Sequence, residues 1–289
     1  MANRVHFGIA TPQQNIAYEQ LLSMWLEADR EPQVDHLWIF DHFMALGENA
    51  DGPCYEAWTT LAGLAARTER VGIGHLVTGN TYRHPAILAR QAVTVDHISQ
   101  GRLYFGIGAA WHEQEHRGFG IPFPGAGERV RRLDEACQVI RLLWTETKPS
   151  FNGRYYQLEE AHSEPKPLQK PHPPIIVAAS GEQMLRVVAK HADIWASQSR
   201  TIEDFREKSA RLNQRCEEIG RDPATLARLG AAWIDPTASD FSEVRAYVTQ
   251  MIEAGATHIV LNPGGKYPAG VIRLIVDEVI QPIKQATSL

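Results

Sequence analysis

The sequence has few cysteines, no block of basic residues and no long apolar run. Its three cysteines, Cys54, Cys137 and Cys216, lie far apart among 289 residues and form no CxxC pair. They therefore indicate reduced thiols rather than a disulfide framework or a zinc ribbon. The net charge of −5 and the scattered lysines and arginines argue against nucleic acid as a partner. Because no apolar run approaches membrane-spanning length, we expect no membrane partner either.

The start of the chain also lacks the marks of a secretory signal. MANRVHFGIA runs directly into a strand-like pattern, without a charged start, an apolar stretch and a small-residue cleavage site. Together with the reduced thiols, this predicts a cytoplasmic protein.

Short β-rich runs alternate with longer helical patterns along the whole chain. The β-rich runs, such as LWIF and HIVL, are nearly continuous apolar stretches, which is typical of parallel strands covered on both faces. The segments between them carry apolar residues three and four apart, as in Gly127–Thr145. The predicted strands are Arg4–Ala10, His36–Phe40, Val71–Val77, Leu103–Ile107, Ile175–Ala179, Asp193–Ala196, Leu229–Ile234 and His258–Leu261.

The number of strands favours an α/β fold of the (β/α)8 TIM-barrel type, with residues 1–289 as one domain. A doubly wound open sheet is the alternative, but no dinucleotide-binding fingerprint follows the first strand. An insertion rich in proline and aromatics, at about residues 147–173, interrupts the alternation between strands four and five. Within it, FNGRYYQL predicts a hairpin with a turn at Asn152–Gly153.

In such a barrel the active site lies at the carboxyl ends of the strands, so the residues that follow each strand are the candidates. Asp41 and His42 follow the second strand. A carboxylate and an imidazole at this place can hold a ring and relay a proton. The alternative for both residues is a helix cap or a salt link within the loop.

The third and fourth strands are followed by polar and small residues, respectively. Thr78 and Asn80 offer hydrogen bonds suited to the polar edge of a heterocycle, although a polar loop leading into a helix would look the same. Gly108, Ala109 and Ala110 are small enough for backbone amides to approach a planar ligand. This run is no Rossmann fingerprint, because its third glycine is absent.

Ser180 and Gly181 follow the fifth strand and precede a predicted helix. The free amides and dipole of a helix N-terminus suit a cofactor phosphate, and an ordinary N-cap at Ser180 is the alternative. Arg200, just past the sixth strand, could meet an anionic ligand, but an exposed arginine needs no such explanation.

One motif points to a different kind of chemistry. His112–His116 reads HEQEH and matches the HExxH pattern, in which two imidazoles bind zinc and the glutamate acts as a base. The metzincin continuation is missing, nearby glycines and Pro122 leave little helix, and no distinctive third ligand follows. A zinc peptidase is thus a remote alternative, and we expect no metal.

Several sequence segments together resemble the luciferase-like monooxygenase superfamily, and most of all its F420-dependent oxidoreductases, whose cofactor is a deazaflavin. They are DHF, TYRHPAILARQAVTVDHISQGRLYFGIGAAWHEQEHRGFGIPFP, GERVRRLDEACQVIRLLWTE, FNGRYY, PPIIVAASG and HADIWA. The resemblance covers essentially the whole chain and is most specific between Tyr82 and Pro124. It implies a barrel, usually dimeric, with the cofactor ring against a bulge after the third strand. A non-prolyl cis peptide is frequent in that bulge and would fall near Leu76–Val77.

The resemblance also implies roles for single residues. Asp41 and His42 match positions beside the ring and the substrate, with His42 the first candidate for proton relay and His112 the second. The matched cofactor-binding positions are Leu76, Val77, Thr78, Asn80, Gly108, Ala109, Ala110, Gln114, Ala178, Ala179, Ser180 and Gly181.

The sequence departs from the family pattern at two places. Ala110 stands where the family often has glycine, which would narrow the approach to the ring. Trp111 stands where the sugar-phosphate dehydrogenases of the family carry a glutamate acid, so neither that acid role nor that substrate class transfers.

We therefore expect an oxidoreductase that moves a hydride between coenzyme F420 and a small organic substrate. An FMN-dependent monooxygenase, supplied with reduced flavin by a separate reductase, is the alternative within the same fold. A barrel that binds a flavin without catalysis is a further one. The resemblance implies a homodimer.

Overall fold

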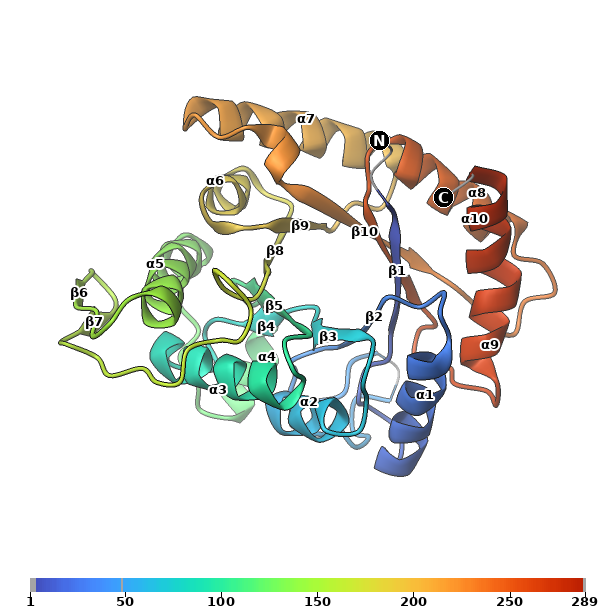
Figure 1. The fold of residues 1–289 in the computed structure, drawn as a ribbon, viewed down its shortest axis with the longest axis horizontal. Helices are drawn as coiled ribbons and strands as arrows, with labels where there is room; N and C mark the ends of the chain where they lie inside the picture. The colour runs from blue at the N-terminus through green and yellow to red at the C-terminus, as the bar shows by residue number, and fades with distance from the viewer. Residues whose placement is uncertain (1–3, 48, 288–289) are drawn as a thin grey trace.

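In a computed structural model, which describes residues 4–47 and 49–287, eight parallel strands close into a barrel enclosed by helices (Figure 1). The barrel order is β3-β2-β1-β11-β10-β9-β8-β5, and pairing of β3 with β5 closes the ring. The predicted (β/α)8 fold is thus confirmed, and the open sheet is excluded. The eight barrel strands are β1 His6–Ala10, β2 His36–Ile39, β3 Gly72–His75, β5 Leu103–Gly108, β8 Ile175–Ala179, β9 Ile194–Ser197, β10 Ala227–Trp233 and β11 His258–Asn262, and the short β4 Thr78–Gly79 also pairs with β5.

The helices cover the outer face of the barrel, one or more after each strand (Figure 1). They are α1 Tyr18–Arg30, α2 Ala57–Ala65, α3 Pro85–Ile98, α4 Glu113–Gly118, α5 Ala126–Thr145, α6 Glu182–His191, α7 Ile202–Glu218, η1 Pro223–Thr225, α8 Ser242–Glu253, α9 Val271–Ile275, η2 Val276–Ile280 and α10 Gln281–Thr287. Within the described part of the chain, none of them is both long and apolar enough to cross a bilayer.

The third strand differs from its prediction. It was expected as one run, Val71–Val77, but β3 ends at His75 and the chain bulges before β4 resumes pairing with β5. The Leu76–Val77 peptide within this bulge is cis, as the family resemblance implied. The bulge turns the chain at the carboxyl end of the sheet.

Successive side chains of each strand point to opposite faces of the barrel wall, and this alternation produces two apolar cores. Side chains that point outward, such as Phe7, Ile73 and Val177, pack against the helices. Side chains that point inward form a smaller cluster around Trp38 and Leu229. These bulky residues fill the middle of the barrel, as expected for this fold.

The two ends of the barrel interior differ in side-chain size. At the base, where the strands begin, the rings of His6, His36 and His258 stack on one another. Toward the carboxyl ends, the inward positions hold Ala178 and Ala196, which are neighbours on β8 and β9. Because alanine leaves space that leucine or phenylalanine would fill, the barrel is hollow at this end.

Hydrogen bonds join the insertion between α5 and β8 to α5. Its predicted hairpin is present as β6 Phe151–Asn152 and β7 Gln157–Leu158, and it projects beyond α5 (Figure 1). The Glu135 carboxylate of α5 accepts the backbone N–H groups of Tyr155 and Tyr156. The insertion is therefore an ordered part of the molecule beside α5.

Candidate active site

A cavity of about 890 Å³ opens at the carboxyl ends of the barrel strands. Residues that follow β2, β3, β5, β8 and β9 line it, together with Leu229 and Ala231 within β10. Its size lies at the upper end of the range for small-molecule and cofactor sites. The predicted site residues that line it are Asp41, His42, Leu76, Val77, Thr78, Gly108, Ala109, Ala110, Ala178, Ala179 and Ser180.

Four predicted site residues do not line this cavity. Asn80 is buried and its amide donates to the Tyr156 hydroxyl at 3.3 Å, so it faces the insertion. Gln114 is exposed in the first turn of α4. Gly181 is exposed as the N-cap residue of α6. His112 lies beside His42, with ring centroids 5.9 Å apart.

Asp41 is engaged in a buried ion pair. Its carboxylate is bound in a fork by Arg83, at 2.6 and 3.1 Å, and it also accepts the Thr78 hydroxyl. Arg83 reaches Glu56 as well, at 2.6 Å. Burial lowers the pKa of Arg83, but the charges and hydrogen bonds of Asp41 and Glu56 outweigh this and raise it. Asp41 therefore forms part of the wall and is not a free acid.

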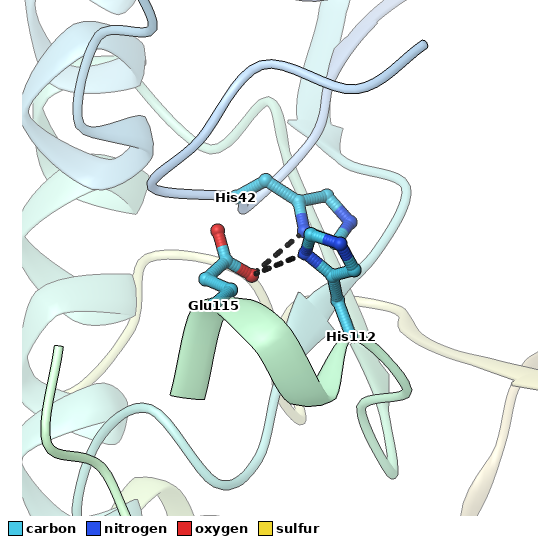
Figure 2. Close-up of side chains that lie close together, drawn as sticks. All are labelled: His42, His112 and Glu115. Carbon is cyan, nitrogen blue, oxygen red and sulfur yellow. Dashed lines mark hydrogen bonds and ion pairs between the residues drawn. The ribbon is translucent and has the colours of Figure 1, made fainter. Parts of the chain in front are cut away.

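His42 is held by a carboxylate that the sequence analysis did not single out (Figure 2). Its Nδ1 lies 2.9 Å from Oε2 of Glu115, which projects from α4. The other oxygen of Glu115 accepts the backbone N–H groups of Phe43 and Met44, the latter at 3.0 Å. Tyr82 donates its hydroxyl to Oε2 as well.

Glu115 is ionised despite its burial. The side chain is fully buried, which raises its pKa, but hydrogen bonds from His42, Tyr82 and Phe43 outweigh this and lower it to about 2. The same charges act on their neighbours: burial and Glu115 raise the pKa of Tyr82, and burial with Glu115 raises that of Cys54 to about 12. Glu115 is thus a buried anion among neutral hydroxyl and thiol groups, beside the buried Asp41–Arg83 ion pair.

The zinc-peptidase interpretation of HEQEH is wrong. His112 is the N-cap residue of α4, so it does not share a helical face with His116. Both ring nitrogens of His116 are engaged, Nε2 with the Thr81 hydroxyl and Nδ1 with the His112 carbonyl oxygen, each at 2.7 Å. His116 is therefore a packed structural residue, and the two imidazoles do not converge.

Cationic and hydrogen-bonding groups lie at the far side of the cavity. An N-cap at Ser180 is not observed, because α6 begins at Glu182 and its cap, Gly181, makes no side-chain hydrogen bond. Arg200 and Lys208 line the same cavity. Lys208 is 2.7 Å from Asp204, whereas the Arg200 side chain has no partner among the described residues. This end suits an anion.

Ala110 has an unusual backbone. It lines the cavity with a φ of +57°, in the left-handed region that favours glycine. Its side chain adds a methyl group to the wall.

Glu115, Tyr82 and Arg83 are the contributors that sequence reasoning missed. Glu113 and Glu115 both fall in the first turn of α4, and only the fold shows that Glu113 pairs with Arg117 at the surface while Glu115 points inward. Arg83 lies within the family-like block, but its partners come from residues 41 and 56. No local signal could have identified either partner.

Fold and cavity define the class: a (β/α)8 barrel with a cofactor-sized site at the carboxyl ends of its strands. The model of the luciferase-like monooxygenase family matches residues 5–271, and the chain belongs to this family.

The names of similar proteins state two different cofactors, F420 and reduced FMN. The chain is 30% identical over 291 residues to an F420-dependent glucose-6-phosphate dehydrogenase of Kineococcus radiotolerans, covering 82% of this chain and 85% of that protein. It is 29% identical over 189 residues to an FMNH2-dependent dimethylsulfone monooxygenase of Pseudomonas putida, covering 63% and 51%. An F420-dependent secondary alcohol dehydrogenase, solved with an F420–acetone adduct, has the same fold, with a TM-score of 0.86 at 19% identity and coverage of 97% and 99%.

Proposed function

We propose that the protein is an oxidoreductase that transfers a hydride between coenzyme F420 and a small organic substrate. The observation that carries the proposal is the single cavity bounded by the segments after β2, β3, β5 and β8, with His42 fixed at its wall. Membership of the luciferase-like family and the similarity to an F420-dependent dehydrogenase support it.

The residues present fit a flat ring with an anionic tail. Ala178 and Ala196 leave the hollow, and Leu76 and Val77 provide apolar surface for a ring face. At the other side, Ser180, the first turn of α6 and the unpaired Arg200 would hold a phosphate or carboxylate tail.

A bound deazaflavin supplies the group that accepts or donates the hydride. The chain itself has three tasks. His42 accepts or returns the substrate proton, Asp41 with Arg83 and Thr78 stiffens the wall beside it, and the apolar bulge excludes water from the reacting face.

FMN is the second candidate cofactor. It is favoured by the similarity to an FMNH2-dependent monooxygenase and by its smaller tail, which the cavity would also admit. In that case a separate reductase would supply reduced flavin. For either cofactor we propose a cytoplasmic homodimer, supported by the family resemblance and by the three free cysteines.

The test is a titration of the purified protein with oxidised F420 and with FMN, followed by fluorescence, and then a search for substrate-dependent reduction of the bound compound. We expect F420 to bind at least about tenfold more tightly, a difference of roughly 1.4 kcal/mol. Tighter binding of FMN with oxygen consumption would establish the monooxygenase instead. Binding of neither compound would refute both.

A pair of variants localises the binding. Ala178→Leu places three more carbon atoms in the hollow and should abolish binding of either compound. Ala286→Leu makes the same change at an exposed position of α10 and should bind like the original protein. Equal binding by both variants would contradict the assignment of the cavity.

A further inference from the structure

We infer that Glu115 is a positioning residue that fixes the tautomer of His42, so that Nδ1 carries the proton and Nε2 presents a lone pair to the substrate. The catalytic part of this inference rests on the proposed function, whereas the tautomer itself does not. Neither Glu115 nor its role was predicted from the sequence.

The hydrogen bonds of Glu115 leave it one orientation. Oε1 is held by the backbone N–H groups of Phe43 and Met44, which immediately follow His42 in the chain. Oε2 therefore faces His42 Nδ1, 2.9 Å away, and the Tyr82 hydroxyl. The same loop that carries His42 thus also fixes the carboxylate that orients it.

An ionised carboxylate can only accept hydrogen bonds. The 2.9 Å contact therefore requires the proton to be on Nδ1 of His42, and the neutral ring then has an unprotonated Nε2. Nε2 has no hydrogen-bond partner within residues 4–47 and 49–287, and His42 lines the cavity. A free lone pair at this wall is what a proton acceptor needs.

Packing holds the ring in the same plane. The edges of Phe40 and Trp111 meet His42 with centroids 5.0 and 5.6 Å away. His112 lies beside His42 and faces the same oxygen of Glu115, but its Nδ1 is 3.8 Å from Oε2, beyond hydrogen-bond distance, and has no hydrogen-bond partner in the described part of the chain. Figure 2 draws both contacts, and only the shorter one, to His42, is a hydrogen bond, so His42 is the imidazole that Glu115 orients.

The groups that could change the charge around His42 are few. From α4 and the residue before it these are Glu115 and His112, and from the chain beside His42 these are Asp41 and Cys54. Behind them lie Tyr82, bound to Glu115, and Arg83 with Glu56, bound around Asp41. Of these groups, only Glu115 lies within hydrogen-bond distance of His42 Nδ1, at 2.9 Å.

Substitution of Glu115 by glutamine should invert the tautomer. The two backbone N–H groups would retain the amide oxygen, which leaves the amide NH2 facing His42. A donor at this place needs an acceptor, so Nδ1 would lose its proton and Nε2 would gain it. The variant changes no side-chain size, and Glu113→Gln, on the exposed side of the same turn, is the matched control.

The experiment is ¹⁵N NMR of histidine-labelled protein without cofactor. We expect His42, assigned by its absence in His42→Ala, to be protonated at Nδ1 in the original protein and in Glu113→Gln, and at Nε2 in Glu115→Gln. If Glu115→Gln does not fold, the tautomer of His42 in the original protein still tests the inference. A proton on Nε2 there would overturn the inference, as would an unchanged tautomer in a folded Glu115→Gln.

Turnover then tests the catalytic part. In Glu115→Gln we expect substrate-dependent reduction to fall by about 10²-fold or more, with F420 affinity within about threefold and a changed pH profile. Glu113→Gln should retain the turnover and pH profile of the original protein. A protein that shows the predicted tautomers but binds no F420 would refute the proposed function alone. Unchanged turnover in a Glu115→Gln variant with an inverted tautomer would refute the positioning role alone.

Discussion

The two ends of the barrel use histidine in opposite ways. At the base, the indole N–H of Trp38 donates to Nδ1 of His36 at 2.6 Å, and the ring stacks on His258. At the mouth, the end where the strands finish and the cavity opens, Nδ1 of His42 lies 2.9 Å from the carboxylate of Glu115. A donor partner makes Nδ1 an acceptor, and an acceptor partner makes it a donor. The comparison teaches that the second residue, rather than the histidine itself, determines the role.

Burial has different consequences at the two ends. At the base no carboxylate of the described residues contacts His36, and burial lowers the pKa of His36 to about 3. Burial and the neighbouring His6 lower the pKa of His258 to about 4. These rings are neutral packing groups. At the mouth, a buried anion is stabilised by four hydrogen bonds and faces the imidazole that lines the cavity.

The largest expected difference between the two ends is in turnover. Once a substrate is found, His42→Ala should lower turnover by about 10²–10⁴-fold, because a proton relay is lost. His258→Phe, which preserves a ring in the base stack, should leave turnover per folded molecule within about twofold. Steady-state rates normalised to F420-binding protein check this, and equal losses in both variants would erase the functional distinction.

A second difference concerns ion pairs. Arg83→Met at the mouth would leave Asp41, which is fully buried, without its charge partner and should lower the free energy of unfolding by about 3–5 kcal/mol. At the base, Arg4 pairs with Asp35 at 2.8 Å but is 71% exposed, so Arg4→Met should cost about 1 kcal/mol or less. Urea unfolding of both variants measures the two values. Similar losses would show that the mouth pair is not specially dependent on its partner.

The base histidines also predict a response to acid. Their folded-state pKa values lie below the ordinary value of 6.5, so the unfolded chain binds more protons as the pH falls from about 6.5 toward 4. Stability is therefore full above pH 6.5 and declines below it, by up to about 1.4 kcal/mol per pH unit for each histidine. The melting temperature of His36→Phe should fall less steeply than that of the original protein as the pH is lowered below 6.5. An identical pH dependence would place the acid sensitivity elsewhere.

The smallest effect concerns two non-glycine residues with positive φ, one at each end. Ala110 at the mouth has a φ of +57° and Gln100 near the base has one of +56°. Replacing either by glycine should change the free energy of unfolding by only about 0.5–1 kcal/mol, in the stabilising direction. Only Ala110→Gly should also alter F420 affinity, because only Ala110 lines the cavity. A change of affinity in Gln100→Gly would contradict this.

The barrel was predictable because parallel strands buried on both faces leave continuous apolar runs in the sequence. Runs such as Ile175–Ala179 coincide with an observed strand, and the helix predicted at Gly127–Thr145 is α5 within one residue. The split of Val71–Val77 was not predicted from the run itself, because a bulge changes the backbone without changing the apolar pattern.

The ends of the predicted strands were enough to locate the cavity. They were not enough to predict which side chains contact one another inside it. The position of His42 and Ser180 at the cavity could be predicted because the fold puts the residues after each strand at one end. Glu115 and Arg83 could not be assigned, since their contacts join residues 27 to 73 positions apart in the chain. Such contacts are set by how loops pack, and periodicity within one segment carries no record of them.

The central claim, that the mouth rather than the base binds the cofactor, is tested most directly by hydrogen–deuterium exchange with and without oxidised F420. We predict slower exchange in residues 40–44, 76–82, 108–116 and 178–184, and no change around residues 100–102 and 168–170 at the opposite end. Protection at the base, or no protection in those four mouth segments when F420 saturates the protein, would contradict the account.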